Sequence, residues 1–125
     1  MYTANSIAKK AGTTVRTVQY YDRIGLFSPV DRTDTGYRLY DEDSVAVLRE
    51  ILLYRELGFS ISEIRQLLSA DETQRRDLIS RHVEKLKRQI SDYEDRIVYV
   101  RILDHFGVEQ ACGFLEDIEK KEKKK

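Results

Sequence analysis

A heptad pattern in the C-terminal half limits the folds of this chain more than any other feature. Apolar side chains recur there at alternating spacings of four and three residues, at Ile79, Val83, Leu86, Ile90, Tyr93, Ile97 and Val100. Such spacing predicts a helix that buries one stripe of side chains against another helix. We expect this helix to cover residues 72–104 and to be about 50 Å long.

The heptad helix needs a partner that the rest of the chain cannot supply. Only about 70 residues precede it, and a domain of that size cannot cover the whole stripe. The same helix of a second chain is the expected partner, so the seven heptad residues are the predicted dimer interface. Gly107 should end the coil, and Val108, Ala111 and Leu115 have the spacing of a short amphipathic helix before a charged tail.

Residues 13–40 predict a short helix followed by a β-hairpin. Thr13 or Thr14 is a candidate N-cap, because its hydroxyl can accept a hydrogen bond from a free backbone N–H. Gly25 is suited to end this helix, since glycine takes the left-handed conformation without strain. Residues 34–36, Asp-Thr-Gly, have the composition of a hairpin turn between two short extended arms.

Three further helices are expected, two of them beside this segment. Thr3 can cap a first helix, and Gly12 provides the turn to the next; two short helices joined in this way fit the helix-turn-helix motif. Asp41 can cap a third helix, and Ser60 with Glu63 forms a capping box for a fourth. The predicted fold is mainly α. It comprises a winged helix-turn-helix domain with a small β-hairpin wing over residues 1–70, a dimerisation helix over 71–104, and a short C-terminal helix with a charged, solvated tail over 105–125.

The third predicted helix should contribute most of the apolar side chains to the core. The 3.6-residue period is followed by Val45, Leu48, Leu52 and Arg55, and Ile51 and Leu53 are expected to widen the apolar face.

The distribution of charge favours a nucleic-acid contact by the first 40 residues. The whole chain holds 22 basic and 22 acidic residues. Residues 1–40, however, hold six Lys or Arg against three Asp, a net of +3, whereas residues 41–70 hold three Arg against six acidic residues, a net of −3. Positive charge therefore coincides with the predicted helix and hairpin, where it can meet a phosphate backbone.

Several other classes of function are disfavoured. No apolar run approaches the roughly 20 residues that span a bilayer, and the N-terminus has no apolar signal segment, so we expect a cytoplasmic protein without a membrane partner. A single cysteine, Cys112, permits no intrachain disulfide and argues against a zinc cluster. We find no nucleophile–base set and no Gly-rich phosphate loop, so neither an enzyme nor a metal or cofactor site is expected.

The predicted helix at the start of the 13–40 segment offers four candidate DNA contacts. Arg16 and Thr17 lie early in it, where side chains reach base edges, and Arg can make two hydrogen bonds to guanine O6 and N7. Tyr20 can donate its hydroxyl to a phosphate oxygen. Two roles are open for Tyr21, a contact to the DNA backbone or packing in the core.

The hairpin adds two candidates. Arg38 is expected to contact the DNA backbone or the minor groove, and Tyr37 lies beside it. Tyr37 and Tyr40 could instead pack the hairpin onto the core, and for Tyr40 we expect packing.

Cys112 has two readings. A free cysteine on an apolar helical face is usually an inert small hydrophobe. A thiol sensor would need exposure, a lowered pKa and a nearby cation. His105 lies seven residues upstream, but Gly107 interrupts the helix between them, and metal binding by His82, His105 and Cys112 is not favoured.

Residues 3–70 resemble the MerR family of bacterial transcription regulators. The segments TVRTVQYYDRIGLFSPVDRTDTGYRLYDEDSV and LREILLYRELGFSISEIRQLL carry the likeness, with the elements YYD, GL, P, GYR.Y and GFS..EI in their usual order and spacing. The resemblance implies that residues 4–23 form the helix-turn-helix and that the heptad helices pair antiparallel. It also implies six DNA contacts: Arg16, Thr17, Tyr20 and Tyr21 on the helix, and Tyr37 and Arg38 on the flanking wing.

The resemblance also implies a mechanism. A homodimer associated with the nucleoid would bind an imperfect palindrome in double-stranded promoter DNA, within an over-long spacer. Effector binding would then bend and untwist the DNA, so that RNA polymerase can engage both promoter elements.

Two departures from the family pattern bear on the effector. Gln19 stands where many members have Arg. The chain has one Cys and only about 20 residues after the coil, so neither a metal sensor nor a large drug-binding domain is expected. A thiol-reactive signal at Cys112, or a small organic ligand near Phe106 and Phe114, remains open. So do an effector-independent repressor or architectural protein, and a protein-interaction adaptor that uses the winged domain.

Overall fold

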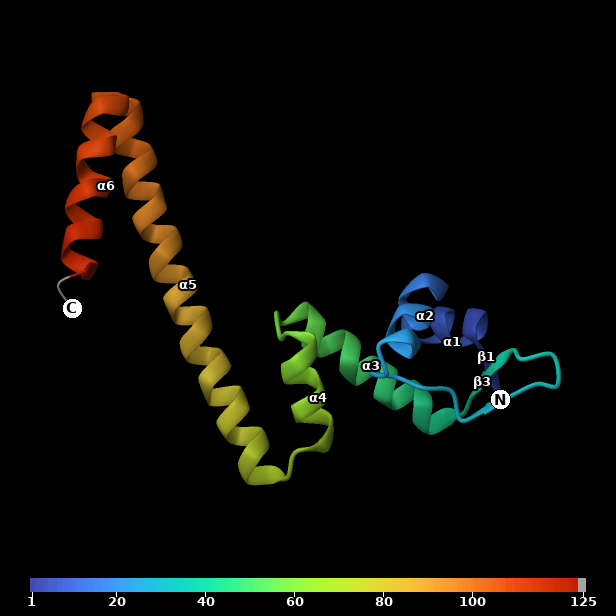
Figure 1. Cartoon of the computed structure of the whole chain (residues 1–125). Coiled ribbons are helices and arrows are strands. Elements are labelled where there is room, and N and C mark those ends of the chain that lie inside the picture. Colours follow the sequence, from blue (N-terminus) through green and yellow to red (C-terminus); the bar gives the residue numbers. More distant parts are fainter. Residues whose placement is uncertain (124–125) are drawn as a thin grey trace. The chain divides into compact units, whose positions relative to one another are not determined.

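The computed structural model describes residues 1–123 of the chain, which divides into two compact units, Met1–Leu78 and Ile79–Lys125 (Figure 1). The helices of the first unit are α1 (Ala4–Ala11), α2 (Val15–Arg23), α3 (Glu42–Glu56) and α4 (Ile61–Ser69). Its strands are β1 (Tyr2–Thr3), β2 (Asp31–Arg32) and β3 (Arg38–Tyr40). α5 (Glu72–Phe106) and α6 (Val108–Lys123) follow. The predicted fold class, helices with a small wing and one long helix, is confirmed.

The helix-turn-helix, α1 and α2, begins at two threonine caps. Thr3 Oγ1 accepts a hydrogen bond from the Ser6 N–H at 3.1 Å, and the Thr3 N–H donates to Ser6 Oγ at 2.7 Å. Of the two candidates for the second cap, the structure shows Thr14, whose Oγ1 accepts from the Thr17 N–H at 3.2 Å. Gly12 has a φ of +80° between the helices, which explains why glycine stands in this turn.

The caps of α3 and α4 were also predicted correctly. Asp41 accepts a hydrogen bond from the Ser44 N–H at 2.8 Å. Ser60 and Glu63 form the expected reciprocal pair: the Glu63 N–H donates to Ser60 Oγ at 3.1 Å, and the Ser60 N–H donates to Glu63 Oε1 at 2.9 Å. Each cap satisfies backbone N–H groups that have no partner within their helix.

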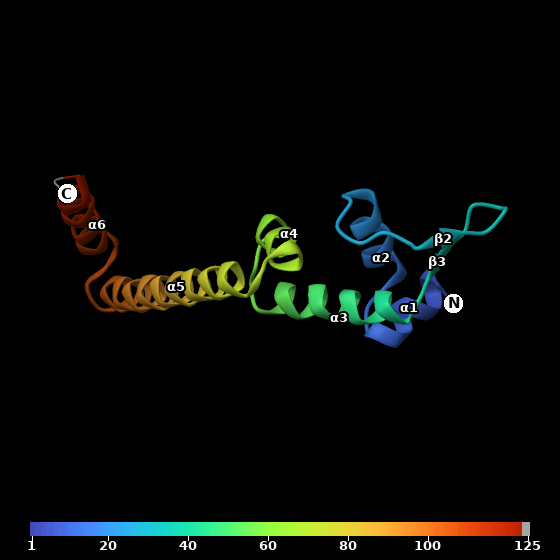
Figure 2. The same cartoon turned by 90° about the horizontal axis from the view of Figure 1, so that it is seen from below.

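The wing belongs to a three-stranded antiparallel sheet with the order β1-β3-β2. β2 and β3 are the two predicted arms, and they close on a turn in which Gly36 has a φ of +87°. The third strand was not predicted: β1 pairs with β3, with Tyr2 opposite Tyr40. Figure 2 shows the hairpin extending away from α1 and α2.

The core of the first unit lies between the helix-turn-helix, β3, α3 and α4. Its fully buried side chains are Ile7, Val18, Tyr40, Leu48, Ile51 and Ile64. One expectation was wrong. Leu53, predicted to widen the apolar face of α3, is 55% exposed, while its neighbour Tyr54 is 4% exposed. The inward face of α3 therefore follows Val45, Leu48, Ile51 and Tyr54, a phase that a helix rich in leucine on several sides does not reveal.

α5 begins at a further cap and runs two residues beyond the predicted end. The Gln74 N–H donates to Asp71 Oδ1 at 2.8 Å, and the start of the helix reaches the core of the first unit through Leu78. Within the second unit, all seven heptad residues are exposed, from 39% for Leu86 to 61% for Tyr93 and Val100.

α6 continues to Lys123, beyond the end of the apolar pattern. The final two residues of the charged tail, 124–125, lie outside the described residues. None of the helices in residues 1–123 combines the length and the apolarity that crossing a membrane requires.

Candidate nucleic-acid interface

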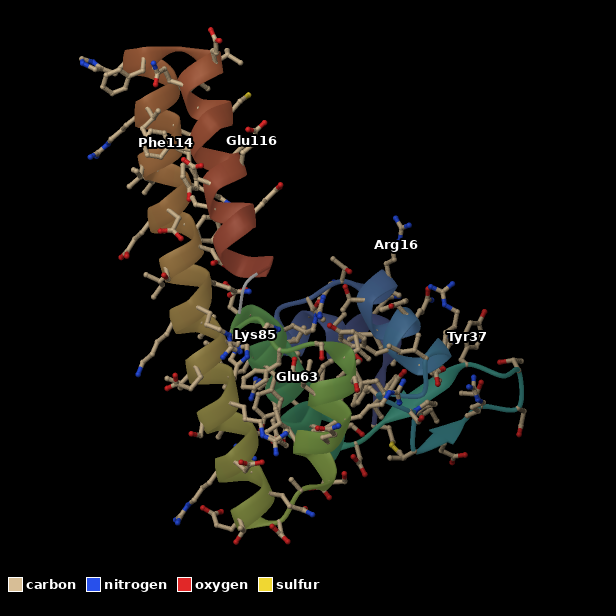
Figure 3. The ribbon with its side chains drawn as sticks, turned by 60° about the vertical axis from the view of Figure 1, so that its left-hand side comes forward. Arg16, Tyr37, Glu63, Lys85, Phe114 and Glu116 are labelled. Carbon is tan, nitrogen blue, oxygen red and sulfur yellow. The ribbon has the colours of Figure 1, made fainter. Side chains whose placement is uncertain are left out.

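Helix α2 separates a buried face from an exposed one. Val18 is fully buried and Tyr21 is 6% exposed. Arg16 and Gln19 are exposed, and Figure 3 shows the Arg16 side chain pointing outward from α2. A helix fixed by its inner face thus presents an arginine at its N-terminal end, the end from which helix-turn-helix proteins contact base edges.

Thr17 and Tyr20 differ in how much of each side chain is available to a ligand. The Thr17 hydroxyl lies 3.0 Å from Thr14 Oγ1, so Thr17 takes part in the cap of its own helix. Tyr20 is 44% exposed, and the Arg23 guanidinium carbon lies 5.8 Å from the centre of its ring. Such a cation–π contact restrains the ring while its hydroxyl stays near solvent.

Tyr21 lies in the core. Its ring centre is 5.9 Å from that of Tyr20, and its burial shows the packing role of the two that the sequence left open. A DNA contact by the Tyr21 hydroxyl stays a prediction.

The wing tyrosines have opposite environments. Tyr37 is 71% exposed. Tyr40 is fully buried and its ring stacks on Phe27, with centres 5.2 Å apart and planes 6° from parallel. Packing by Tyr40 is therefore confirmed. Burial raises the pKa of the Tyr40 hydroxyl, and the negative charge of Asp22 raises it further.

Arg38 does not project alone from the wing. Its Nε donates to Asp22 Oδ2 at 2.5 Å, and the same oxygen accepts from Arg32 Nη2 at 3.4 Å. Sequence reasoning missed this cluster of Asp22, Arg32 and Arg38, which we call the wing clamp. The available signal was the position of Asp22 in the last turn of α2, where the helix dipole disfavours a carboxylate.

A hollow of about 380 Å³ is lined by residues from the start of α1, from α2 and from the wing. Its lining residues are Thr3, Ala4, Asn5, Val15, Gln19, Gly36, Tyr37 and Arg38. We call it the α2–wing hollow. Asn5 and Gln19 were not among the predicted contacts, yet their amides can both donate and accept hydrogen bonds beside Tyr37 and Arg38.

Two arginines donate hydrogen bonds to the backbone at the C-terminal ends of α1 and α2. Arg49 on α3 donates from Nη2 to the Lys10 carbonyl at 3.1 Å, at the end of α1. Arg65 on α4 donates to the carbonyls of Ile24 and Gly25, just after α2. These carbonyls carry the negative end of the helix dipole, so a guanidinium satisfies both their hydrogen bonding and their charge.

The C-terminal residues singled out by the sequence do not form a metal site in the described structure. Cys112 is exposed in this chain, so it is not packed within it. Among residues 1–123, no group of three or more His, Cys, Asp or Glu side chains is arranged to hold a metal ion.

Comparison with known proteins identifies the family to which this architecture belongs. Residues 2–71 match the model of the family described as MerR HTH family regulatory protein. This chain belongs to the MerR family. Residues 2–71 therefore form the DNA-binding helix-turn-helix domain of a MerR-family regulator, with the β2–β3 hairpin as its wing.

Relatives of different lengths share the MerR domain. The heavy metal-dependent transcription regulator 2 of Rhizobium meliloti is 32% identical in an alignment 120 residues long, which covers 89% of this chain and 82% of that protein. Several other curated relatives are longer, and this chain spans 35–40% of their length. What those proteins do as wholes does not transfer directly to this chain.

Two solved structures are similar over most of this chain. The N-terminal part of the multidrug transporter activator of Bacillus subtilis, MtaN, is 30% identical with a TM-score of 0.74, covering 81% of this chain and 95% of that one. EcmrR in a complex with DNA is 27% identical with a TM-score of 0.70, covering 86% of this chain and 41% of that one.

Proposed function

We propose that this MerR-family regulator binds promoter DNA as a homodimer, with α2 in the major groove and the wing beside it. The observation that carries the proposal is the α2–wing hollow, because Gln19 from the recognition helix meets Tyr37 and Arg38 from the wing on one surface. The similarity to EcmrR, solved as a DNA complex, supports it.

The DNA contacts divide into base reading and backbone positioning. Arg16, exposed at the start of α2, reads a base edge. Tyr20 and Tyr37 donate to phosphates, and Thr17 and Tyr21 contribute through their hydroxyls at closer range. Arg38 meets a phosphate with its terminal nitrogens, because its Nε is held by Asp22.

Dimerisation rests on the heptad residues of α5. All seven are between 39% and 61% exposed in the single chain, which is an extended apolar surface of the kind that marks an interface. An antiparallel pair of these helices, as in the family, places two winged domains on one duplex. The two half-sites then form a palindrome.

Regulation follows the family mechanism in this proposal. The dimer distorts the promoter spacer in response to an effector, and RNA polymerase then engages the promoter on the nucleoid, in the cytoplasm. Exposed Cys112 supports a thiol-reactive effector. A hollow of about 540 Å³ that includes His105 and Phe106 supports the alternative of a small organic ligand.

The test of the proposed function is binding to duplexes selected from a random pool by the purified protein, measured by fluorescence anisotropy. Arg16→Ala should relax preference at one position in each half-site, at a cost of roughly 1–3 kcal/mol. Arg76→Ala, which removes an exposed charge from α5, is the matched control. An equal loss on every sequence would make Arg16 a phosphate contact. Absence of any DNA binding at moderate salt, with Arg16→Ala and Arg38→Ala both silent, would favour the protein-interaction adaptor.

Transcription assays distinguish an effector-responsive regulator from a regulator that acts without an effector. Wild type and Cys112→Ser are compared on the selected promoter before and after treatment with peroxide or an aldehyde. Switching by wild type alone makes Cys112 the sensor. Identical behaviour of both proteins removes that role, and the organic ligand and the constitutive repressor remain.

A further inference from the structure

The wing clamp joins the two elements of the interface through one carboxylate. Asp22 lies in α2, whereas Arg32 and Arg38 lie on the two strands of the hairpin. The Asp22 side chain is 13% exposed and that of Arg38 is 28% exposed, so this ion pair is largely shielded from solvent. A partly buried pair with a short Nε–Oδ2 contact restrains geometry more strongly than an exposed one.

The strand register places two positive charges beside the carboxylate. Arg32 and Arg38 are direct partners across the β2–β3 pair, and like charges placed opposite each other destabilise a sheet. Asp22 Oδ2 accepts from both arginines, so it compensates their repulsion at the point where they face α2. Asp22 also occupies the unfavourable end of the helix dipole. The stabilisation that Asp22 provides therefore comes from its contacts with the wing and not from α2 itself.

Arg32 and Arg38 differ in which of their nitrogens donate hydrogen bonds within the clamp. Arg32 donates from Nη2 to Asp22 and from Nη1 to the Gly36 carbonyl in the wing turn, at 3.4 Å each. Arg38 engages Asp22 through Nε, and none of the described residues accepts a hydrogen bond from its terminal nitrogens. The clamp thus holds Arg38 through Nε and leaves its terminal nitrogens available for a ligand, in a residue that lines the α2–wing hollow.

We propose that Asp22 is a positioning residue for sequence discrimination: it sets the spacing between recognition helix and wing and aims Arg38 at one phosphate, without touching DNA itself. This inference rests on the proposed DNA-binding function. Without the carboxylate, both arginines are free to meet phosphates in many registers. Binding to random DNA then rises while binding to the operator falls.

The test compares Asp22→Asn with Asp34→Asn in the full-length chain. Both variants remove one negative charge, but Asp34 lies in the wing turn, outside the clamp. Affinity for the selected operator and for a random duplex of equal length is measured over a series of salt concentrations. We expect Asp22→Asn to lower the ratio of the two affinities by about tenfold, and to steepen the salt dependence on random DNA by the equivalent of about one extra phosphate contact. Asp34→Asn should change both affinities together, and Asp22→Glu should recover part of the ratio.

Several outcomes would overturn the inference or the function beneath it. If the affinity ratios of Asp22→Asn and Asp34→Asn agree, Asp22 acts through its charge alone and the positioning role is wrong. If the wild type shows no preference for any duplex, the proposed function itself has failed, which is a separate result.

Arg38→Lys provides a second route if Asp22→Asn does not fold. Lysine keeps the charge but has one nitrogen, so it cannot hold Asp22 and a phosphate with separate edges. We expect the same loss of ratio as for Asp22→Asn, and no further loss when the two changes are combined. A ratio unchanged by Arg38→Lys, in a protein that melts like wild type, contradicts the proposal.

Discussion

The two compact units of this chain place their apolar side chains in opposite ways. In Met1–Leu78, buried residues from α1, α2, β3, α3 and α4 form one core. In the second unit, the heptad stripe of α5 is exposed throughout, and Val108, Phe114 and Leu115 of α6 are 48% exposed or more. The first unit thus closes a hydrophobic core within one chain. The second leaves an apolar surface exposed in the single chain, the surface that we propose as the dimer interface.

This contrast has a consequence for stability. The free energy of unfolding of the first unit should depend on its own contacts, whereas that of the second should depend on protein concentration, as for any association-linked fold. Substitutions placed in one unit or the other can test whether the distinction holds.

The largest effect is expected in the heptad stripe. Ile90→Asp places a carboxylate at the centre of the proposed interface in both copies, where burial without a partner is costly. We expect monomers in sedimentation velocity, at least a hundredfold weaker self-association by that argument, and little operator binding. Ser91→Asp, an exposed neighbour outside the stripe, adds the same charge and should stay dimeric. A dimer that survives Ile90→Asp would place the interface elsewhere.

A pair of leucine truncations compares the two units directly. Leu48→Ala removes a fully buried side chain from the first unit and should cost about 2–5 kcal/mol at any protein concentration. Leu86→Ala removes a side chain that is 39% exposed in the single chain. Because Leu86 gains further burial only in the proposed dimer, its effect on the melting temperature should depend on protein concentration and disappear at dilutions where the wild type is itself monomeric. Equal, concentration-independent losses in both variants would show that the second unit is stabilised within one chain.

A smaller effect is expected at the end of the recognition helix. Arg65→Met keeps much of the side-chain volume but removes the donors to the Ile24 and Gly25 carbonyls. Because Arg65 is exposed, we expect a loss of only about 1 kcal/mol in stability, together with weaker operator binding. Arg76→Met, at an exposed position on α5, serves as the control in thermal melting and anisotropy. Identical operator affinity for the two variants would mean that α2 keeps its place without Arg65.

The smallest effect concerns pH. The hydrogen bonds from Ser44 hold the pKa of the Asp41 carboxyl below its ordinary value of 3.8. A lowered folded-state pKa means that the ionised cap stabilises α3 above that value, and that this stabilisation is lost as the pH falls through the folded-state pKa. Asp41→Asn keeps an acceptor but does not titrate. The gap in melting temperature between wild type and Asp41→Asn should therefore shrink below pH 4, and a gap independent of pH would refute the assignment. Asp43→Asn, in the same turn, is the control.

The sequence predicted the features that depend on neighbouring residues. The caps and the turn involve contacts between residues no more than four positions apart, so their roles follow from local chemistry; examples are Thr14, Gly36 and the Ser60–Glu63 pair. The heptad spacing likewise determines α5 within two residues of its end. These elements, with the MerR-like motifs, were sufficient for the fold class.

Long-range features were missed for a physical reason. Asp22 meets Arg38 across 16 residues, and β1 meets β3 across more than 35. Neither contact leaves a periodic pattern, because each joins two short segments that are unremarkable alone. The prediction that Leu53 is buried was wrong for a different reason. Three adjacent apolar residues in α3 left open which side of the helix faces inward, and only packing against α4 and the helix-turn-helix decided which side is buried.

The pairing of β1 with β3 has a practical consequence for laboratory work on this protein. Residues 2 and 3 are a strand of the same sheet as the wing, so an affinity tag or fluorescent protein fused to Met1 would be tethered at that sheet. Such a fusion would crowd the duplex and weaken binding for reasons unrelated to the native side chains. Reporters for binding assays therefore belong at the other end of the chain.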